Sequence, residues 1–224
     1  MSKPVVYVVQ CAVDADYEAE FERWYADRHG PDLVRSGFLS AQMFRSLDEP
    51  SAYLTVYDAP EHNVFTSEVY AAARAADPVL PIAESHIGSK MTKGRFAHRV
   101  AAGVAGSGLP SIDSEHVVTL RAQVHETQLD AAFATFAGET APALVAAGAS
   151  RAWWSHLVGL HNLFPQLVPP NTLAVAEVDA AAWSAFEVPE LVSETADGGG
   201  AFVVHRYERI FRLANGNTVY SNAV

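Results

Sequence analysis

The chain has 224 residues, of which 50% are hydrophobic and 18% are charged, so a folded globular protein is expected and a disordered one is excluded. Lys and Arg number 15 and Asp and Glu number 26, which gives a formal charge of −11. This balance argues against binding to nucleic acid or to an anionic membrane, because both need clustered cations. A neutral or hydrophobic small molecule, or another protein, is the expected partner.

The single cysteine, Cys11, excludes an intrachain disulfide and fits a reducing compartment. It lies in the apolar run VVYVVQCAV at residues 5–13, where a buried and inert thiol is expected. That run is a poor signal peptide, since Tyr and Gln interrupt it and acidic residues follow at once. No apolar run in the sequence approaches the ~18 residues that a membrane span needs. We therefore expect a cytoplasmic protein.

The first hundred residues predict the order strand, helix, strand, strand, helix, strand. Residues 5–13 are β-branched and apolar, which is typical of a buried strand. Asp14 and Asp16 are candidate N-caps for an acidic helix whose aromatic residues recur at helical spacing. FLSAQMFR and AYLTVYD, on either side of a turn, predict a hairpin. HNVFTSEVYAAARAA predicts a second helix that ends at Asp77, and SKMTKGRFAHRV predicts the closing strand.

Residues 101–115 lack periodicity and concentrate Gly, Ser and Pro, as linkers do. Beyond them the same order begins again. VVTLRAQV, SRAWWSHLVGL, NTLAVAEV and AFVVHRYERIFRL predict strands, while ETQLDAAFATFAGETAPALVAAG and AAWSAFEVPELVSE predict helices. The expected organisation is a first unit at 1–100, the linker, a second unit at 116–213 and a C-terminal tail at 214–224.

The two halves can be overlaid as an internal repeat. RWYADRHGPDLVRSG matches ATFAGETAPALVAAG without a gap when Pro31 is set on Pro142. The paired positions include Gly37 with Gly148 and His29 with Thr140. Overlaying YLTVYDAPEHNVF on LAVAEVDAAAWSAF also pairs Tyr57 with Glu177. These matches predict an α+β fold of two ferredoxin-like βαββαβ repeats fused in one chain, and chance similarity between two α+β halves is the alternative.

One helix of the first half carries a recognisable motif. Trp24 is followed by His29-Gly30-Pro31, then by Leu33 and by a strand that Gly37-Phe38 opens. An aromatic residue, His-Gly-Pro-Leu and a Gly-led strand mark the EthD-like proteins of the dimeric α+β barrel superfamily, which this stretch resembles. It departs from their pattern at Asp32, which is inserted between the proline and the leucine.

The resemblance implies two sheets packed face to face as a barrel with helices outside, here formed within one chain as a pseudo-dimer. It also implies a small-molecule pocket between sheet and helices. Members of the superfamily include cofactor-free cyclases, isomerases, dehydratases, lyases and decarboxylases that act on polyketide-like or aromatic compounds, and some haem-dependent relatives. The fold alone fixes neither reaction nor substrate.

His29 is the candidate acid–base group. It lies four residues after Tyr25 and eight after Phe21, at the edge of the apolar face of the helix. Gly30 and Pro31 are expected to break the helix directly after it. The imidazole would then lie near the negative end of the helix dipole, which favours its protonated form. Such a histidine can act as general acid or base near neutral pH, and the alternative is a histidine that only caps the helix.

Tyrosine hydroxyls are the expected helpers of His29. Tyr53, Thr55 and Tyr57 alternate along one strand and therefore share a face, where they could orient or protonate a substrate oxygen. Core tyrosines with satisfied hydroxyls are the alternative. Tyr7 on the first strand joins either that face or the opposite one, because the sequence does not fix the register. Trp24 is the aromatic residue of the motif and a candidate substrate contact.

The second half adds candidate binding residues. Arg121 and Glu177 fall on inward faces of neighbouring predicted strands, which favours an ion pair across the barrel, because unpaired buried charges are costly. The sharper interpretation is that Arg121 anchors a substrate carboxylate. Trp153 and His205 lie on aromatic strands that could wall a pocket for an aromatic ring or form the interface of a homodimer.

The sequence offers no ligand set for a cofactor. The histidines have no metal-ligand spacing, no Gly-rich phosphate loop joins a strand to a helix, and Gly-x-Ser-x-Gly is absent. We therefore expect no metal and no nucleotide. The expected function is a cofactor-independent lyase, or a related isomerase, that acts on a small hydroxylated aromatic or polyketide-like compound by proton transfer. A non-catalytic small-molecule or haem-binding protein is the alternative.

Overall fold

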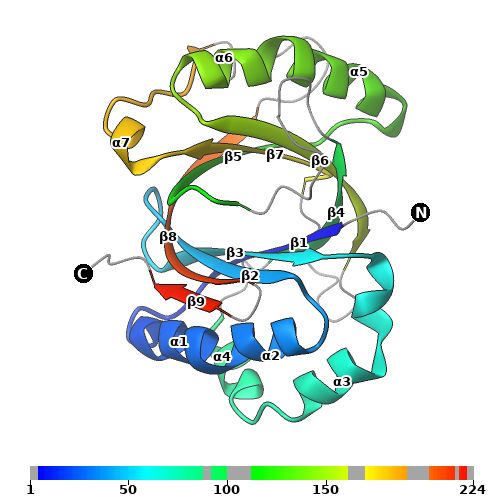
Figure 1. The fold of residues 1–224 in the computed structure, drawn as a ribbon, viewed down its shortest axis with the longest axis vertical. Helices are drawn as coiled ribbons and strands as arrows, with labels where there is room; N and C mark the ends of the chain where they lie inside the picture. Colours follow the sequence, from blue (N-terminus) through cyan, green and yellow to red (C-terminus); the bar gives the residue numbers. More distant parts are fainter. Residues whose placement is uncertain are drawn as a thin grey trace.

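The computed structural model describes residues 5–87, 92–99, 112–160, 170–190, 202–214 and 217–220. In this part of the chain nine strands form one antiparallel sheet in the order β2-β3-β1-β4-β6-β7-β5-β8-β9. An additional pairing of β2 with β8 closes the sheet into a barrel. The helices lie outside the barrel on two opposite sides (Figure 1).

The elements of the first half follow the predicted order, with extra short helices. They are β1 (Val5–Ala12), α1 (Glu18–Trp24), the π-helix η1 (Tyr25–His29), α2 (Gly30–Arg35), β2 (Ser40–Ser46), β3 (Ala52–Ala59), the 3-10 helix η2 (His62–Thr66), α3 (Glu68–Ala75), α4 (Leu80–His86) and β4 (Thr92–Arg99). The predicted second helix is thus divided, because η2 and α3 are separate elements and Ser67 caps the start of α3 by accepting a hydrogen bond from the Tyr70 N–H.

The second half repeats this plan. Its elements are β5 (His116–Ala122), the 3-10 helix η3 (Glu126–Gln128), α5 (Leu129–Thr135), the π-helix η4 (Phe136–Thr140), α6 (Ala141–Ala146), β6 (Arg151–Leu160), β7 (Thr172–Val178), α7 (Ala180–Trp183), β8 (Val203–Ala214) and β9 (Asn217–Tyr220). Within the expected tail at 214–224, β9 pairs antiparallel with β8. Most of the predicted linker lies outside the described residues, and Ile112 near its end is buried.

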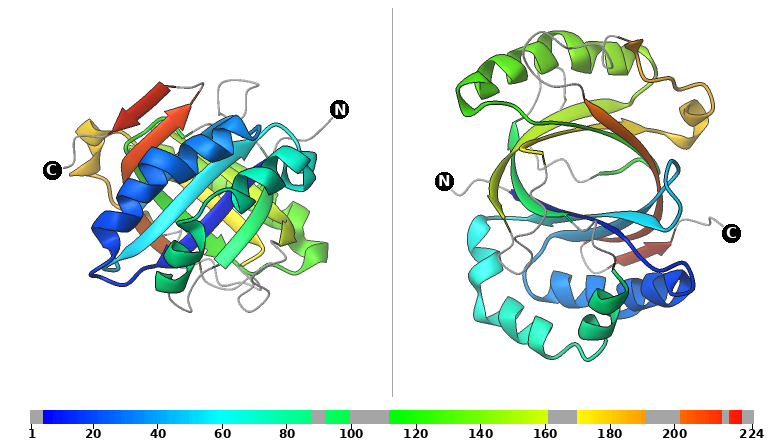
Figure 2. Two further views of the ribbon diagram at one scale, coloured as in Figure 1. Left: turned by 90° about the horizontal axis from the view of Figure 1, so that it is seen from below. Right: turned by 180° about the vertical axis from the view of Figure 1, so that it is seen from behind.

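The barrel is one continuous sheet, where two sheets packed face to face were expected. The halves are joined by hydrogen-bonded pairs at both seams, β4 with β6 and β2 with β8. Closure of this kind leaves no unpaired strand edge at either seam. Figure 2 shows the barrel between the two helical layers, with the helices of each half covering the outer face of their own strands.

Side chains alternate between the barrel interior and the helical layers. Along β1, Val6 and Val8 belong to the apolar cluster inside the barrel, which also contains residues of the second half such as Val117. Tyr7 and Val9 belong instead to the cluster between the first-half strands and their helices. The register of Tyr7, which the sequence left open, is thereby settled, since Tyr7 pairs with Tyr57 and faces the helices.

The helix that carries the His-Gly-Pro motif does not break at Gly30. Gly30 has a helical φ of −58°, and α1, η1 and α2 run on without interruption until Gly37, whose φ is +110°. Gly30 is needed for close packing, because a Cβ built there would lie 2.9 Å from the Phe211 ring. The expected position of His29 at a helix end is therefore wrong: the imidazole lies in the middle of a continuous helical segment, at a π-turn. Such π-turns are frequent at functional sites.

The second half reproduces this local structure at the positions that the sequence overlay pairs. The π-helix η4 ends at Thr140, as η1 ends at His29, and Gly148 has a φ of +113° that matches that of Gly37. The strand overlay that pairs Tyr57 with Glu177 is wrong by one residue. Glu177 pairs with Arg151 three residues after Gly148, whereas Asp58 pairs with Ser40 three residues after Gly37.

Glu177 therefore corresponds to Asp58, and Tyr57 corresponds to Ala176. A shift of one residue moves a strand side chain from one face of the sheet to the other. This explains why Glu177 lies inside the barrel while Tyr57 faces the helices.

Candidate functional site

A cavity of about 40 Å³ lies between the first-half strands and their helices. Its walls come from β1, β3, α1, η1, α2, α3 and α4. The lining side chains are mostly aromatic or apolar, with a few polar groups: Tyr7, Val9, Cys11, Phe21, Trp24, Tyr25, His29, Leu33, Thr55, Tyr57, Tyr70, Arg74, Leu80, Glu84 and Ile87. Three of the residues singled out for catalysis or binding, His29, Tyr57 and Trp24, are thus brought together, and Tyr7 joins them.

His29 is fixed in this cavity by two neighbours. Its ring stacks on Trp24 with centroids 4.5 Å apart and planes at 29°. Its Nδ1 lies 3.9 Å from Oδ2 of Asp77, and the Trp24 indole N–H donates to the same oxygen at 3.0 Å. Nδ1 of the imidazole faces Asp77, so Nε2 lies on the side of the ring away from that carboxylate. The ring itself lines the cavity. Orientation of an imidazole by a carboxylate is the arrangement that general acid–base histidines use.

Asp77 is buried, with only 5% of its surface exposed, and both of its carboxylate oxygens have partners. Its Oδ1 accepts hydrogen bonds from the Val79 and Leu80 N–H groups at the start of α4 and forms an ion pair with Arg28 at 3.2 Å. Burial raises the pKa of the Asp77 carboxyl, but the interactions with His29, the Val79 N–H and Trp24 outweigh it and lower the pKa to about 2. Asp77 is therefore ionised at neutral pH.

The lowered pKa of Asp77 predicts a loss of stability in acid. The folded value of about 2 lies below the usual 3.8, so the contribution to the free energy of unfolding is present above pH 4 and disappears as the pH falls towards 2. Its size is about 2 kcal/mol. We expect the difference in free energy of unfolding between wild type and Asp77→Asn to shrink by that amount between pH 5 and pH 2, as measured by urea denaturation. A difference that stays constant over this range would contradict the ionised Asp77.

Hydroxyl groups gather at the strand side of the cavity. Tyr57 is 3% exposed, and its ring stands edge-on to His29 with centroids 6.5 Å apart. Burial raises the pKa of the Tyr57 hydroxyl, so this group stays protonated at neutral pH and can donate a proton or a hydrogen bond. Thr55, two residues away on β3, is buried and places its hydroxyl beside those of Tyr25 and Tyr57. Three hydroxyl groups thus lie together at the cavity wall, where they could bind a polar group of a ligand.

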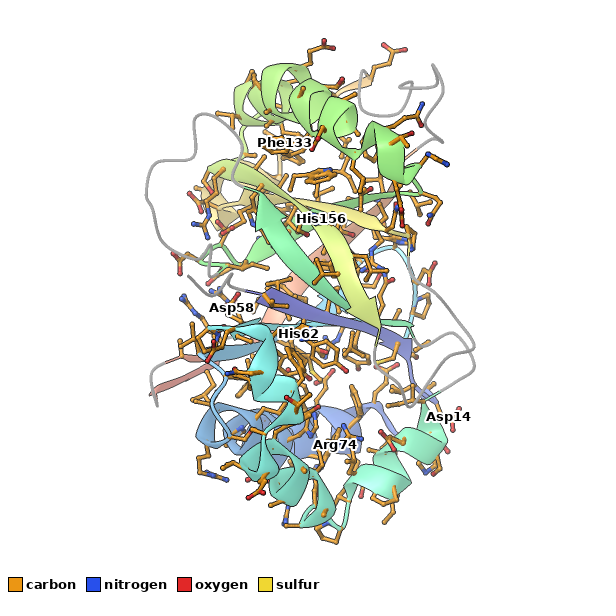
Figure 3. All side chains as sticks on the ribbon, turned by 90° about the vertical axis from the view of Figure 1, so that its right-hand side faces the viewer. Asp14, Asp58, His62, Arg74, Phe133 and His156 are labelled. Carbon is orange, nitrogen blue, oxygen red and sulfur yellow. The ribbon has the colours of Figure 1, made fainter. Side chains whose placement is uncertain are left out.

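The outer rim of the cavity is charged. Arg74 on α3 and Glu84 on α4 form an ion pair at 3.4 Å, and both line the cavity. Arg74 also lies over the Tyr70 ring, 6.0 Å from its centroid. Figure 3 shows Arg74 among the helices of the first half, away from the barrel. A ligand that enters between α3 and α4 would meet this pair first.

Tyr53, the other proposed catalytic tyrosine, does not line the cavity. Its hydroxyl donates to Oε1 of Glu22 at 2.8 Å, and its ring packs against Phe21. It lies on the same face of β3 as Tyr57, four residues before it near the start of the strand, and it is not among the residues that line the cavity. Its role in the structure is to hold α1 on the sheet.

The candidate binding residues of the second half do not reach this cavity. Arg121, Trp153, Glu177 and His205 belong to the strands of the second half, and Trp153 is part of the barrel interior. The predicted ion pair of Arg121 with Glu177 is wrong, because the register sets Arg121 opposite Leu173 and Glu177 opposite Val117, four residues away along the same two strands. Glu177 pairs instead with Arg151 at 2.6 Å and accepts from the Trp153 indole at 3.0 Å.

Three aromatic residues of the strands proposed for a dimer interface are buried within the chain. Trp153, Trp154 and Tyr207 are each 1% exposed. Trp153 and Tyr207 fill the barrel interior, whereas Trp154 packs beneath α5 against Phe133, which Figure 3 marks. Packing within the chain therefore accounts for these three residues, and the homodimer stays a prediction.

The equivalent layer of the second half carries no such polar set. The repeated register replaces Tyr7, Thr55 and Tyr57 by Val118, Ala174 and Ala176, and the helix overlay replaces Tyr25 and His29 by Phe136 and Thr140. Most of these residues form an apolar cluster under α5 and α6. Among the described residues, the two halves thus differ in the chemistry of this layer.

Sequence reasoning missed Asp77, Arg74 and Glu84. Asp77 followed by Pro78 was interpreted only as a helix stop, and no spacing along the chain relates it to His29, 48 residues earlier. The Asp-Pro pair was the available signal, because an aspartate just before a helix can accept hydrogen bonds from its first N–H groups. Asp77 accepts from the Val79 N–H in this way, and this contact holds its carboxylate beside His29.

Comparison with known proteins bears on the fold. No protein-family model and no curated protein matches the chain. An anthrone oxidase-like protein of known structure is 12% identical with a TM-score of 0.66, over 99% of this chain and 97% of that one. A proposed monooxygenase from Fusobacterium nucleatum is 12% identical with a TM-score of 0.60, over 98% and 99%. A haem-binding protein from Thermus thermophilus is 12% identical with a TM-score of 0.51, over 94% and 92%.

The chain has the dimeric α+β barrel fold. At 12% identity this likeness concerns the fold alone, and the narrower resemblance to EthD-like proteins stays a prediction. Among the residues that the structure describes, no group of three His, Cys, Asp or Glu side chains is placed to hold a metal ion. None of the described helices has the length and apolar character needed to cross a membrane.

Proposed function

We propose that the protein is a cofactor-independent enzyme, a lyase or a related isomerase, that acts on a small hydroxylated aromatic or polyketide-like compound in the first-half cavity. One observation carries the proposal: the His29 imidazole lines an aromatic cavity while a buried, ionised Asp77 faces its Nδ1. Aromatic walls suit a flat, apolar ring, and His29 with the Tyr57 hydroxyl suits the polar substituent on it.

The geometry suggests a proton cycle. Asp77 favours the tautomer with the proton on Nδ1, which leaves Nε2 as the base. Nε2 takes a proton from a hydroxyl or an acidic C–H of the substrate. The electron pair left behind forms a new π bond, and in a cleavage the leaving atom departs with the electrons of the bond that breaks. The imidazolium, stabilised by Asp77, returns the same proton to the leaving atom or to another carbon of the ring. No net oxidation or reduction occurs, so the cycle needs no external electron carrier.

Binding requires the cavity to widen. A benzene ring occupies a cavity of roughly 150 Å³, whereas this one measures about 40 Å³. The Arg74–Glu84 pair is the part of the wall most able to move, because its side chains are 19% and 25% exposed while the strand side is buried. Separation of α3 from α4 at this pair would admit a ring.

We also infer that the chain is a tandem of ferredoxin-like repeats, the first at 1–100 and the second at 116–213. The shared strand order, the paired π-helices and the paired glycines with positive φ support this. The first repeat would keep the chemistry while the second provides packing, since Thr140 cannot exchange protons near neutral pH as His29 can.

The alternative is a binding protein without catalysis, including one that binds haem. A carboxylate at Nδ1 is also the usual arrangement of a histidine that binds a metal, so Nε2 of His29 would suit a haem iron. The cavity of about 40 Å³ would have to widen far more for haem than for a single aromatic ring, and this difference favours the small aromatic ligand. A stoichiometric Soret band in the purified protein would support the haem alternative and contradict the proposal.

The test is a panel of phenols that each carry a bond which proton transfer alone can break: 2,4-dihydroxybenzoate and 4-hydroxycinnamate, which can lose carbon dioxide, and 4-hydroxybenzyl alcohol, which can lose water. Each is tested beside its O-methylated analogue. Substrate loss is followed by chromatography with mass detection, with and without oxygen. We expect at least one hydroxylated compound to turn over without oxygen, and its methylated analogue to react at least about tenfold more slowly because its hydroxyl proton is gone. Turnover that requires oxygen stoichiometrically would show an oxidative reaction, and no turnover with tight binding would favour the non-catalytic alternative.

A further inference from the structure

Arg121 lies on the opposite face of the sheet from the His29 cavity. It is the next-to-last residue of β5, opposite Leu173 and Val203, and its side chain is directed into the barrel. Only 5% of its surface is exposed. A guanidinium remains charged in proteins under ordinary conditions, even though burial lowers the pKa of Arg121. The end of the barrel interior therefore holds a buried positive charge.

One of the three guanidinium nitrogens of Arg121 forms a hydrogen bond, and the other two do not. Nη1 donates to the Gln10 side-chain carbonyl, and the Gln10 amide in turn donates to the Tyr207 hydroxyl. Nε and Nη2 are buried and form no hydrogen bond. These two nitrogens make up the side of the guanidinium whose N–H groups point the same way, which is the edge that grips both oxygens of a carboxylate.

No carboxylate of the described residues forms an ion pair with Arg121. Two other arginines directed into the barrel differ: Arg151 pairs with Glu177, and Arg209 donates to the carbonyl oxygens of Asp113 and Ser114. A buried cation without a counter-ion costs several kcal/mol. Near Arg121 the described residues place the Tyr207 hydroxyl, with the Thr119 side chain beside it, and His205 is paired with Thr119 across the strands.

We propose that Arg121 anchors a second binding site, at the end of the barrel, for a small organic carboxylate. The two oxygens of the ligand would accept from Nε and Nη2 of Arg121, and Thr119 and His205 flank the same face. Gln10 and His205, at the same end of the barrel, are half-buried. This site is independent of the proposed catalytic function, because β1 separates it from the His29 cavity.

The experiment uses the full chain and compares three anions with chloride at equal ionic strength. Acetate, benzoate and inorganic phosphate are titrated while the melting temperature is followed, and calorimetry at 25 °C gives the stoichiometry. At an anion concentration of 100 times Kd we expect acetate or benzoate to raise the melting temperature by about 5–10 °C over chloride, with one site per chain. A response to phosphate alone, or an equal response to chloride, would overturn the carboxylate assignment.

Variants of single residues test whether the anion that raises the melting temperature is bound at Arg121. Arg121→Met should fold, because an apolar side chain replaces a buried charge, and it should lose the response entirely. Thr119→Val, which keeps the arginine, should weaken binding severalfold and serves if Arg121→Met does not fold. Arg206→Met on the exposed face of β8 is the matched control, and it and His29→Ala should both respond like wild type. A full response in Arg121→Met, or its loss in His29→Ala, would place the anion elsewhere and overturn the proposal.

Discussion

Replacing His29 by alanine is expected to lower turnover by about 10²–10⁴. The melting temperature should also fall, because the buried Asp77 carboxylate loses a partner, so the rate is the quantity that decides. The imidazole is the titratable group that both lines the cavity and faces the Asp77 carboxylate, so its loss removes the proton carrier. His29→Gln keeps most of the stacking on Trp24 but cannot exchange protons, and it should be equally slow. Rates are measured on the best substrate of the phenol panel, and stability by thermal unfolding.

Thr140→Ala is the matched control for His29, because Thr140 ends the second π-helix as His29 ends the first. We expect this control to retain full turnover. If His29 only packs against Trp24, His29→Ala would lower the melting temperature and leave the rate intact. That outcome would end the case for His29 as the acid–base group.

Replacing Glu177 by alanine should destabilise the fold by about 3–5 kcal/mol. Glu177 is 1% exposed, and its carboxylate accepts from Arg151, from the Trp153 indole and from the Asp113 N–H. The substitution removes a buried carboxylate that accepts from all three donors, one of them the half-buried guanidinium of Arg151. For a chain of this length the melting temperature should fall by about 10 °C.

Glu139→Ala provides the control for Glu177, because Glu139 is exposed on the π-helix of the second half. It should change the free energy of unfolding by less than about 0.5 kcal/mol. Turnover of Glu177→Ala, measured well below its melting temperature, should equal that of wild type, since Glu177 lies inside the barrel. A cost below about 1 kcal/mol would show that the Glu177 network is not what holds this end of the barrel.

The order of strands and helices could be read from the sequence because periodicity and turn residues are local signals. The overlay of Pro31 on Pro142 placed His29 on Thr140, and each of these two residues ends a π-helix. The helix break at Gly30 was wrong, since glycine at this point serves the close approach of Phe211, which is 181 residues away in the sequence. Long-range contacts of that kind leave no local signal.

The candidate site shows the same limit. Trp24, His29 and Tyr57 were found because a motif and a two-residue alternation relate them to their own elements. Asp77 was missed because its approach to His29 depends on how α4 is placed. Tyr57 was paired with Glu177 because a strand overlay of unequal lengths permits a slip of one residue, and that slip exchanges the two faces of the sheet.

The most direct test is a crystal structure of the protein with the tightest-binding phenol of the panel. The ring should lie in the first-half cavity between Trp24 and Tyr57, with α3 and α4 moved apart at Arg74 and Glu84. Its hydroxyl oxygen should lie about 2.6–3.2 Å from Nε2 of His29. A ring found under α5 and α6, inside the barrel or on the surface would contradict the assignment of the site to the first half.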